Sequence, residues 1–212
     1  MKKIAVLISG QGSNLQAIIE ACQTGFILGK VVTVISNKID SFGLVRAESA
    51  GIPSRVFLRQ DFTSNLYMDK AIGDYLEDLN VDLIVLAGYM KILTKPFTQR
   101  FAGKILNIHP SLLPKYPRLD TYQRALENGD SEHGTTVHFV NEEIDGGAIV
   151  LQAKVPIFPG DTVEEIELRT REQEYLIYPL VIKWFVEDRL KLIENQAYLD
   201  GKQLPPNGYA NE

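Results

Sequence analysis

The chain has 212 residues, a formal net charge of -5 and 45% hydrophobic residues, a composition that predicts a globular protein with a sizeable core. The slightly acidic balance and the lack of a long basic run argue against a nucleic-acid partner. One cysteine excludes an internal disulfide, three histidines without metal-ligand spacing predict no metal, and no apolar stretch reaches membrane-spanning length. We therefore expect a cytoplasmic protein that binds no membrane.

The amino-terminal half alternates between two periodicities. Residues 4–8, 31–35 and 82–89 are almost unbroken apolar runs, which are typical of parallel strands covered on both faces. Residues 15–22 and 68–79 instead repeat apolar side chains at the spacing of a helix with one buried stripe. The alternation predicts an α/β fold with a doubly wound, mostly parallel sheet, Rossmann-like in this half.

The carboxyl-terminal half has a different pattern. Residues 133–140 and 146–155 are extended runs separated by a turn-rich segment, which predicts antiparallel strands. Thr162 and Glu165 have the spacing of a capping box and open a long helix that should reach about residue 188 and be kinked by Pro179.

The polar tail, residues 200–212, predicts a surface strand followed by a loose end. The chain contains no internal repeat and no linker-like segment. We therefore expect one domain over residues 1–212.

A glycine-containing loop, Ser9 to Asn14, lies between the first strand and the first helix, where backbone N–H groups favour a phosphate. It lacks the third glycine of a dinucleotide fingerprint and the Gly-Lys-Ser/Thr of a Walker loop. Gly12, Ser13 and Asn14 could hold one phosphate, or the loop could be a plain turn in which Ser13 or Asn14 caps the helix.

Asn107 and His109 are two residues apart in a strand that runs into proline, so their side chains project from the same face. The loops after the first and central strands end at the same sheet edge, which predicts one crevice. An amide and an imidazole in a shared space could stabilise an oxyanion, and a nearby carboxylate would favour the protonated imidazole. The pair could also be an ordinary hydrogen-bonded pair at a strand end.

Asp145 is the leading candidate for that carboxylate, although Asp-Gly-Gly between two extended runs is also an ordinary hairpin turn. The sequence offers no serine or cysteine nucleophile. We interpret His133 and His138 as structural hydrogen-bonding residues and Cys22 as part of a helix's apolar stripe.

Five segments occur in an order that resembles the folate-dependent formyltransferase superfamily over essentially the whole chain: VLISGQGSNLQAI, VLAGYMKIL, ILNIHPSLLPKY, HGTTVHFVNEEIDGG and REQEYLIYPLVIKWF. The N-x-H-P-S-L-L-P run with a downstream Asp-Gly-Gly is specific to that superfamily. The Gly-Ser-Asn loop resembles the corresponding loop of the branch that acts on phosphoribosylglycinamide.

The resemblance implies transfer of the formyl group of 10-formyltetrahydrofolate, a cosubstrate, to the amine of 5-phosphoribosylglycinamide in de novo purine biosynthesis. It implies direct attack through a tetrahedral oxyanion, without a covalent enzyme intermediate or a metal. The implied partners are these small molecules only, and the implied state is a monomer or weak homodimer.

Family roles can be carried onto matching positions. The implied catalytic residues are Asn107, His109 and Asp145. The implied substrate-binding residues are Gly12, Ser13 and Asn14 for the phosphate, with Arg171, Glu172, Gln173 and Glu174, of which Glu174 would meet the ribose hydroxyls. The implied folate-binding residues are Met90, Lys91, Ile92 and Leu93, with Asn107, Asn141, Glu142, Glu143, Ile144 and Asp145.

The chain departs from the family pattern at four positions. Arg118 replaces a usual glycine and would be strained by about 1 kcal/mol or more if its backbone needs a positive φ. Asp120 replaces a frequent histidine, and Asn65 replaces an arginine that reaches toward the ligands. Lys91 replaces a frequent arginine, and we expect that exchange to matter little because the matched contacts are largely main-chain.

Three alternative functions remain open at this point. A methionyl-tRNA formyltransferase would carry an additional RNA-binding domain, and a formyltetrahydrofolate hydrolase an additional regulatory domain. A non-catalytic sensor of nucleotide or folate would use the same crevice without turnover.

Overall fold

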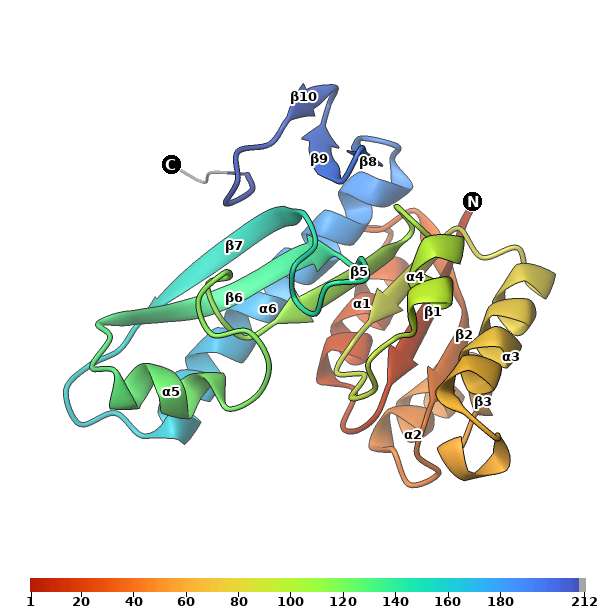
Figure 1. The fold of residues 1–212 in the computed structure, drawn as a ribbon, viewed down its shortest axis with the longest axis horizontal. Coiled ribbons are helices and arrows are strands. Elements are labelled where there is room, and N and C mark those ends of the chain that lie inside the picture. The colour runs from red at the N-terminus through yellow and green to blue at the C-terminus, as the bar shows by residue number, and fades with distance from the viewer. Residues whose placement is uncertain (210–212) are drawn as a thin grey trace. The chain divides into compact units, whose positions relative to one another are not determined.

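The computed structural model describes residues 1–209 and divides into two compact units, Met1–Asn107 and Ile108–Glu212 (Figure 1). The boundary falls inside one strand, whose last residues belong to the second unit. Each unit is described in turn. The expectation of a single domain over the whole chain stays a prediction.

The first unit is built on a parallel sheet. Its strands are β1 (Lys2–Ile8), β2 (Gly29–Ser36), β3 (Ser54–Val56), β4 (Leu83–Leu86) and β5 (Ile105–His109). Their hydrogen-bonded order is β3-β2-β1-β4-β5, with β1 paired on both edges. The run from Ile4 to Ile8 is fully buried, because a central parallel strand is covered on both faces.

Four helices connect these strands: α1 (Ser13–Gln23), α2 (Phe42–Ser49), α3 (Asn65–Asp78) and α4 (Lys95–Arg100), with a short 3-10 turn, η1 (Arg59–Asp61). The strand order moves outward from β1 to β3 and then returns to β4 and β5. Right-handed connections therefore place α1 and α2 on one face and α3 and α4 on the other, and α1 contacts α2 while α3 contacts α4 (Figure 1).

The second unit combines an antiparallel pair with a long helix. After α5 (Thr121–Glu127), β6 (Glu132–Phe139) pairs antiparallel with β7 (Ile149–Pro156). The helix α6 (Val163–Val186) packs against both strands. Thr162 and Glu165 form the capping box expected at its start, and the helix continues through Pro179 to Val186.

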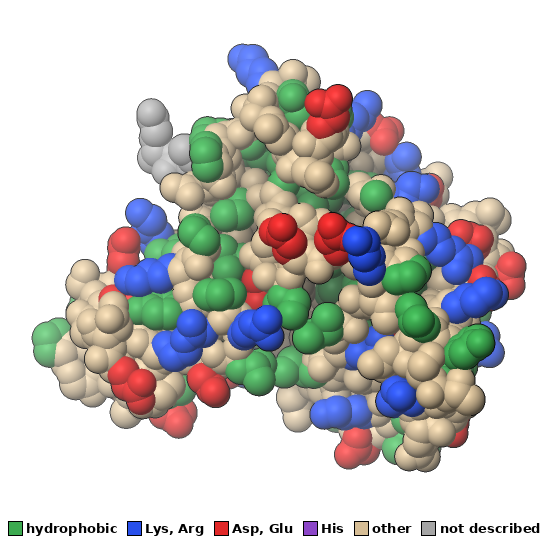
Figure 2. Space-filling view, viewed as in Figure 1, with side chains coloured by type: hydrophobic (Ala, Val, Ile, Leu, Met, Phe, Trp, Pro, Cys, Tyr) green, Lys and Arg blue, Asp and Glu red, His purple; other side chains and the backbone are tan. Residues whose placement is uncertain are grey.

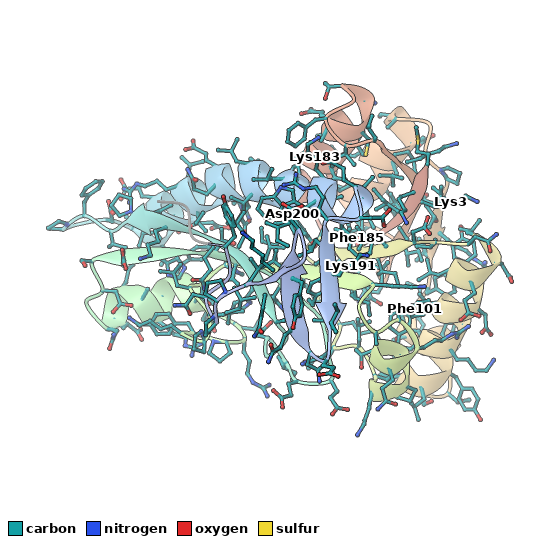
Figure 3. The ribbon with its side chains drawn as sticks, turned by 90° about the horizontal axis from the view of Figure 1, so that it is seen from above. Lys3, Phe101, Lys183, Phe185, Lys191 and Asp200 are labelled. Carbon is teal, nitrogen blue, oxygen red and sulfur yellow. The ribbon has the colours of Figure 1, made fainter. Side chains whose placement is uncertain are left out.

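A small antiparallel sheet follows α6, with strands β8 (Leu190–Ile193), β9 (Gln196–Leu199) and β10 (Lys202–Gln203). Figure 3 labels Lys183 and Phe185 near the end of α6, and Lys191 and Asp200 in the strands and turns beyond it. Arg189, directly before β8, donates through its guanidinium to both carboxylate oxygens of Asp200, directly after β9, at 2.9 and 3.0 Å. The expected surface strand of the tail is β10, and residues 210–212 lie outside the described residues.

The predicted fold class is confirmed: a mostly parallel sheet is extended by antiparallel strands and a long carboxyl-terminal helix. Within residues 1–209, no helix is both long enough and apolar enough to cross a membrane. On the face drawn in Figure 2, the described basic and acidic side chains are interspersed rather than gathered by sign.

Candidate functional site

The glycine loop turns β1 into α1 with a left-handed residue. Gly12 has φ +70° and caps α1, whose first helical residue is Ser13. A Cβ on Gly12 would lie 2.8 Å from the Cα of Gly43, so both the turn and the close approach of two backbones require glycine. Ser13 and Asn14 therefore supply the first turn of the helix rather than its cap, and the N–H groups of a first turn favour an anion.

The segment predicted to meet folate in the first unit, residues 90–93, lies between β4 and α4. Met90 and Ile92 are each 64% exposed. Lys91 instead turns inward, and its Nζ lies 2.5 Å from Oδ1 of the buried Asp69 on α3. The Lys91 side chain thus forms a buried ion pair, and the expectation that the matched contacts here are largely main-chain stays a prediction.

Strand β5 carries both polar residues of the predicted catalytic pair. Asn107 pairs with Leu86 of β4 in the sheet register, and His109, two residues on, is buried at the strand end. Both residues therefore lie in the strand in which they were predicted, and the common face of the amide and the imidazole stays a prediction from strand geometry.

Each ring nitrogen of His109 has a polar neighbour. Its Nε2 lies 2.8 Å from the carbonyl oxygen of Tyr116, and because a carbonyl only accepts, Nε2 carries a proton. Its Nδ1 lies 3.6 Å from Oδ1 of Asp145, within ion-pair range but longer than a hydrogen bond. The structure therefore brings His109 and Asp145 together, as predicted, and adds Tyr116, which the sequence reading missed.

The second carboxylate oxygen of Asp145 is bound by the backbone. The N–H of Arg118 donates to Asp145 Oδ2 at 2.8 Å. Arg118 has φ +69°, and Tyr116 and Asp120 on either side of it have φ +52° and +58°. The suspected strain at Arg118 is thus present, and the left-handed backbone is what directs its N–H at Asp145.

The hairpin segment that contains Asp145 joins β6 to β7. Asn141 Oδ1 accepts from the N–H of Glu143 at 2.9 Å, and Glu142, Glu143 and Ile144 are exposed. Asp145 itself has φ +52°. Gly147 follows at the close of the turn, where an added Cβ would lie 1.7 Å from the carbonyl oxygen of Phe139.

The predicted substrate segment on α6 divides into exposed and buried residues. Arg171 and Glu172 are exposed, and Arg171 forms an ion pair with Glu167 at 2.6 Å. Glu174 is buried, and its Oε2 accepts from the hydroxyl of Thr135 on β6 at 2.9 Å. The same hydroxyl lies 3.1 Å from the carbonyl oxygen of His109, which connects the substrate segment to the end of β5.

The remaining histidines and the cysteine are structural, as expected. His133 Nε2 lies 2.7 Å from the carbonyl oxygen of Pro110, and His138 Nδ1 lies 2.9 Å from that of Phe139. Burial lowers the pKa of both imidazoles. Burial also raises the pKa of the Cys22 thiol to about 11, so the thiolate is scarce at neutral pH.

The predicted site residues are divided between the two units. Gly12, Ser13, Asn14, residues 90–93 and Asn107 belong to the first unit, while His109, residues 141–145 and residues 171–174 belong to the second. Within the described residues, no group of three or more histidine, cysteine, aspartate or glutamate side chains could hold a metal ion.

Comparison with known proteins gives consistent results. Residues 2–182 match the formyl transferase family. The chain is 76% identical to the phosphoribosylglycinamide formyltransferase of Haemophilus influenzae over 212 residues, all of both chains, and 56% identical to that of Escherichia coli over 98% of each. Among solved structures, that of the phosphoribosylglycinamide formyltransferase of Coxiella burnetii is similar with a TM-score of 0.95, at 43% identity and 98% coverage of each chain.

Proposed function

Because the chain belongs to the formyl transferase family, we propose that it carries the activity for which its relatives are named, formyl transfer to phosphoribosylglycinamide in purine biosynthesis. It is an enzyme, a formyltransferase. The observation that carries the proposal is the arrangement at the end of β5, where a buried imidazole faces a carboxylate at 3.6 Å. An imidazole that faces a carboxylate is suited to stabilising an oxyanion that forms during acyl transfer.

The formyl donor in this proposal is 10-formyltetrahydrofolate. The amine of phosphoribosylglycinamide attacks the formyl carbon directly, and the carbonyl oxygen becomes a tetrahedral oxyanion. Asn107 and a protonated His109 stabilise that oxyanion more than the planar ground state, which is the condition for accelerating the chemical step. The attacking nitrogen loses a proton and the departing folate nitrogen gains one, through His109 or an ordered water.

The hydrogen bonds of His109 add a requirement to this mechanism. Asp145 faces Nδ1, so Nε2 is the nitrogen that would donate to the oxyanion. In the structure Nε2 donates to the carbonyl of Tyr116 at 2.8 Å. The proposal therefore requires the carbonyl of Tyr116 to release Nε2 of His109 before the oxyanion forms.

The binding residues have the roles that the resemblance implies. The first turn of α1, with Gly12, Ser13 and Asn14, holds the phosphate. Residues 90–93 and 141–145 border the folate. Residues 171–174 contact the substrate, with the Glu174 carboxylate accepting from the ribose hydroxyls. A single domain, a monomeric or weakly dimeric state and a cytoplasmic location remain predictions of the same proposal.

One assay tests the proposal. The purified protein is mixed with 10-formyltetrahydrofolate and phosphoribosylglycinamide, and the absorbance change of the deformylated folate is followed. We expect turnover that depends on both substrates. Release of formate without the amine would support a hydrolase instead, and turnover only with charged methionyl-tRNA would support the tRNA enzyme. Ligand binding without any turnover would indicate a sensor.

A further inference from the structure

The loop between β4 and α4 is attached to the rest of the first unit by two polar side chains that lie outside the predicted site. They are Ser9, at the end of β1, and Asp69, on α3. Both side chains are almost fully buried, with 4% and 1% of each residue exposed. Buried polar groups are retained where they are fully hydrogen-bonded, so the partners of these two residues identify what they hold.

Ser9 joins three strand ends through one hydroxyl. Its Oγ accepts from the N–H of Met90 at 2.8 Å and donates to Oδ1 of Asn37 at 2.6 Å. Asn37 follows β2 directly, and Met90 follows β4. Ser9 also begins the glycine loop, so the same residue borders the predicted phosphate site and fixes the start of the predicted folate segment.

Asp69 holds the other end of that segment. Its Oδ1 pairs with Lys91 Nζ, and its Oδ2 accepts from the N–H of Thr94 at 2.7 Å. The two side chains of the ion pair are only 2% and 10% exposed. Taking an ion out of water costs several kcal/mol unless it is paired and hydrogen-bonded, so the loop must keep this conformation to satisfy the carboxylate.

Along this loop, side chains that point into the unit alternate with side chains that are exposed to solvent. Lys91 is drawn toward α3, and its Nζ also lies 3.3 Å from the carbonyl oxygen of Ile92. Met90 and Ile92, on either side of Lys91, are displayed to solvent. A segment fixed at its ends and middle presents its other residues in one conformation, which removes the cost of ordering them when a ligand binds.

We propose that Asp69 is a positioning residue for the folate cosubstrate, acting through Lys91 and Thr94, and that Ser9 is its counterpart at Met90. The inference rests on the proposed function for the identity of the ligand, but the anchoring itself is a property of the loop. Asp69 lies too far inside the unit to be a catalytic residue, so its effect should appear in binding rather than in the chemical step.

The test uses the variant Asp69→Asn in the full chain, with initial rates measured against each substrate in turn. We expect KM for 10-formyltetrahydrofolate to rise about tenfold, with kcat within about threefold of the wild type and KM for phosphoribosylglycinamide nearly unchanged. Asp74→Asn is the matched control, because Asp74 is on the same helix but exposed in its pairs with Lys70 and Arg100.

Two further variants keep the test informative if Asp69→Asn folds poorly. Lys91→Arg retains the charge and should preserve the low KM for folate. Lys91→Met combined with Asp69→Asn removes both buried charges and should restore stability without restoring the KM for folate. Hydrogen exchange of the Met90 and Thr94 amides should be faster in both variants that lack the carboxylate, and this readout requires no activity.

The outcomes separate the two proposals. An inactive wild-type protein would overturn the proposed function, whereas faster amide exchange in Asp69→Asn would still support the anchoring. An active wild type with an equal rise of KM for both substrates in Asp69→Asn, or with no rise in either, would overturn the positioning role and leave the proposed function intact.

Discussion

The two units differ in which residues adopt the left-handed backbone conformation at their turns. Among the described residues, the first unit places a single non-glycine residue, Asn80, in the left-handed region and uses glycine at positions such as Gly12 for its other left-handed turns. The second unit places eight non-glycine residues there, and its set near His109 is Tyr116, Arg118, Asp120 and Asp145. Such residues cost about 1 kcal/mol or more each and persist where surrounding bonds fix them. Two such bonds near His109 are that of the Tyr116 carbonyl with His109 and that of the Arg118 N–H with Asp145.

The largest expected effect comes from removing the groups that these strained loops surround. His109→Ala or Asn107→Ala should lower kcat by about two to three orders of magnitude, because each removes an oxyanion donor. The measurement is steady-state turnover of purified variants with both substrates saturating. Gln123→Ala, which removes an exposed amide on α5, is the control and should keep kcat. Near-normal turnover in either variant would exclude that residue from the mechanism.

A second test concerns the pH dependence of the second unit. Burial lowers the pKa of His133 and His138 below the ordinary value of 6.5, so below that pH the unfolded chain binds more protons than the folded one. Stability should therefore be highest above pH 6.5 and fall on acidification, by at most about 1.4 kcal/mol per pH unit for each imidazole.

Urea unfolding at pH 7.5 and 5.5 measures this loss. His133→Gln keeps a donor for the carbonyl of Pro110 but cannot titrate, so the variant should lose less stability over that range than the wild type. Since other groups titrate equally in both proteins, an identical loss would show that His133 does not contribute.

A smaller effect is expected from relieving the backbone strain at Arg118. Arg118→Gly retains the N–H that binds Asp145 and removes the steric cost of φ +69°, so the free energy of unfolding should rise by about 1 kcal/mol with kcat unchanged. Leu119→Gly, at the exposed neighbouring position, relieves no strain. It should lower stability because glycine increases the conformational entropy of the unfolded chain. A fall in stability for both variants would contradict a strained Arg118.

An effect of similar size is expected in the first unit, at Tyr89. Within the described residues, the Tyr89 hydroxyl is buried without a hydrogen-bond partner, and burial, with the nearby Asp69 carboxylate, raises the pKa of Tyr89. Tyr89→Phe should raise the free energy of unfolding by about 1 kcal/mol, because it removes a buried unsatisfied group. Tyr116→Phe should have the opposite sign, since the Tyr116 hydroxyl donates to Asp130 at 2.6 Å. Equal effects in thermal melts would refute this difference.

Much of the fold could be predicted from the sequence because its signals are local. Unbroken apolar runs indicated buried parallel strands, and the Thr162–Glu165 spacing indicated the start of α6. The strand that contains Asn107 and His109 was likewise indicated by its apolar neighbours.

The hydrogen bonds and the ion pair that position the predicted site residues could not be predicted in the same way. His109 and Asp145 are bound by the carbonyl of Tyr116 and the N–H of Arg118, and backbone groups leave no mark on residue identity. Asp69 did leave a signal: it precedes Ile72 and Leu76 by three and seven residues, so an acidic residue lies on the buried face of α3. Its partner is 22 residues away, which no local pattern reveals.

The hairpin that carries Asp145 ends at Gly147, where the absence of a Cβ atom is required. At Gly147 the space for a first side-chain carbon is already filled by the carbonyl oxygen of Phe139. Any other amino acid would force β6 and β7 apart at the point where they begin to pair, and the carboxylate two positions earlier would be carried away with them. We therefore expect a substitution at position 147 to disturb the site, although the residue takes no part in the chemistry.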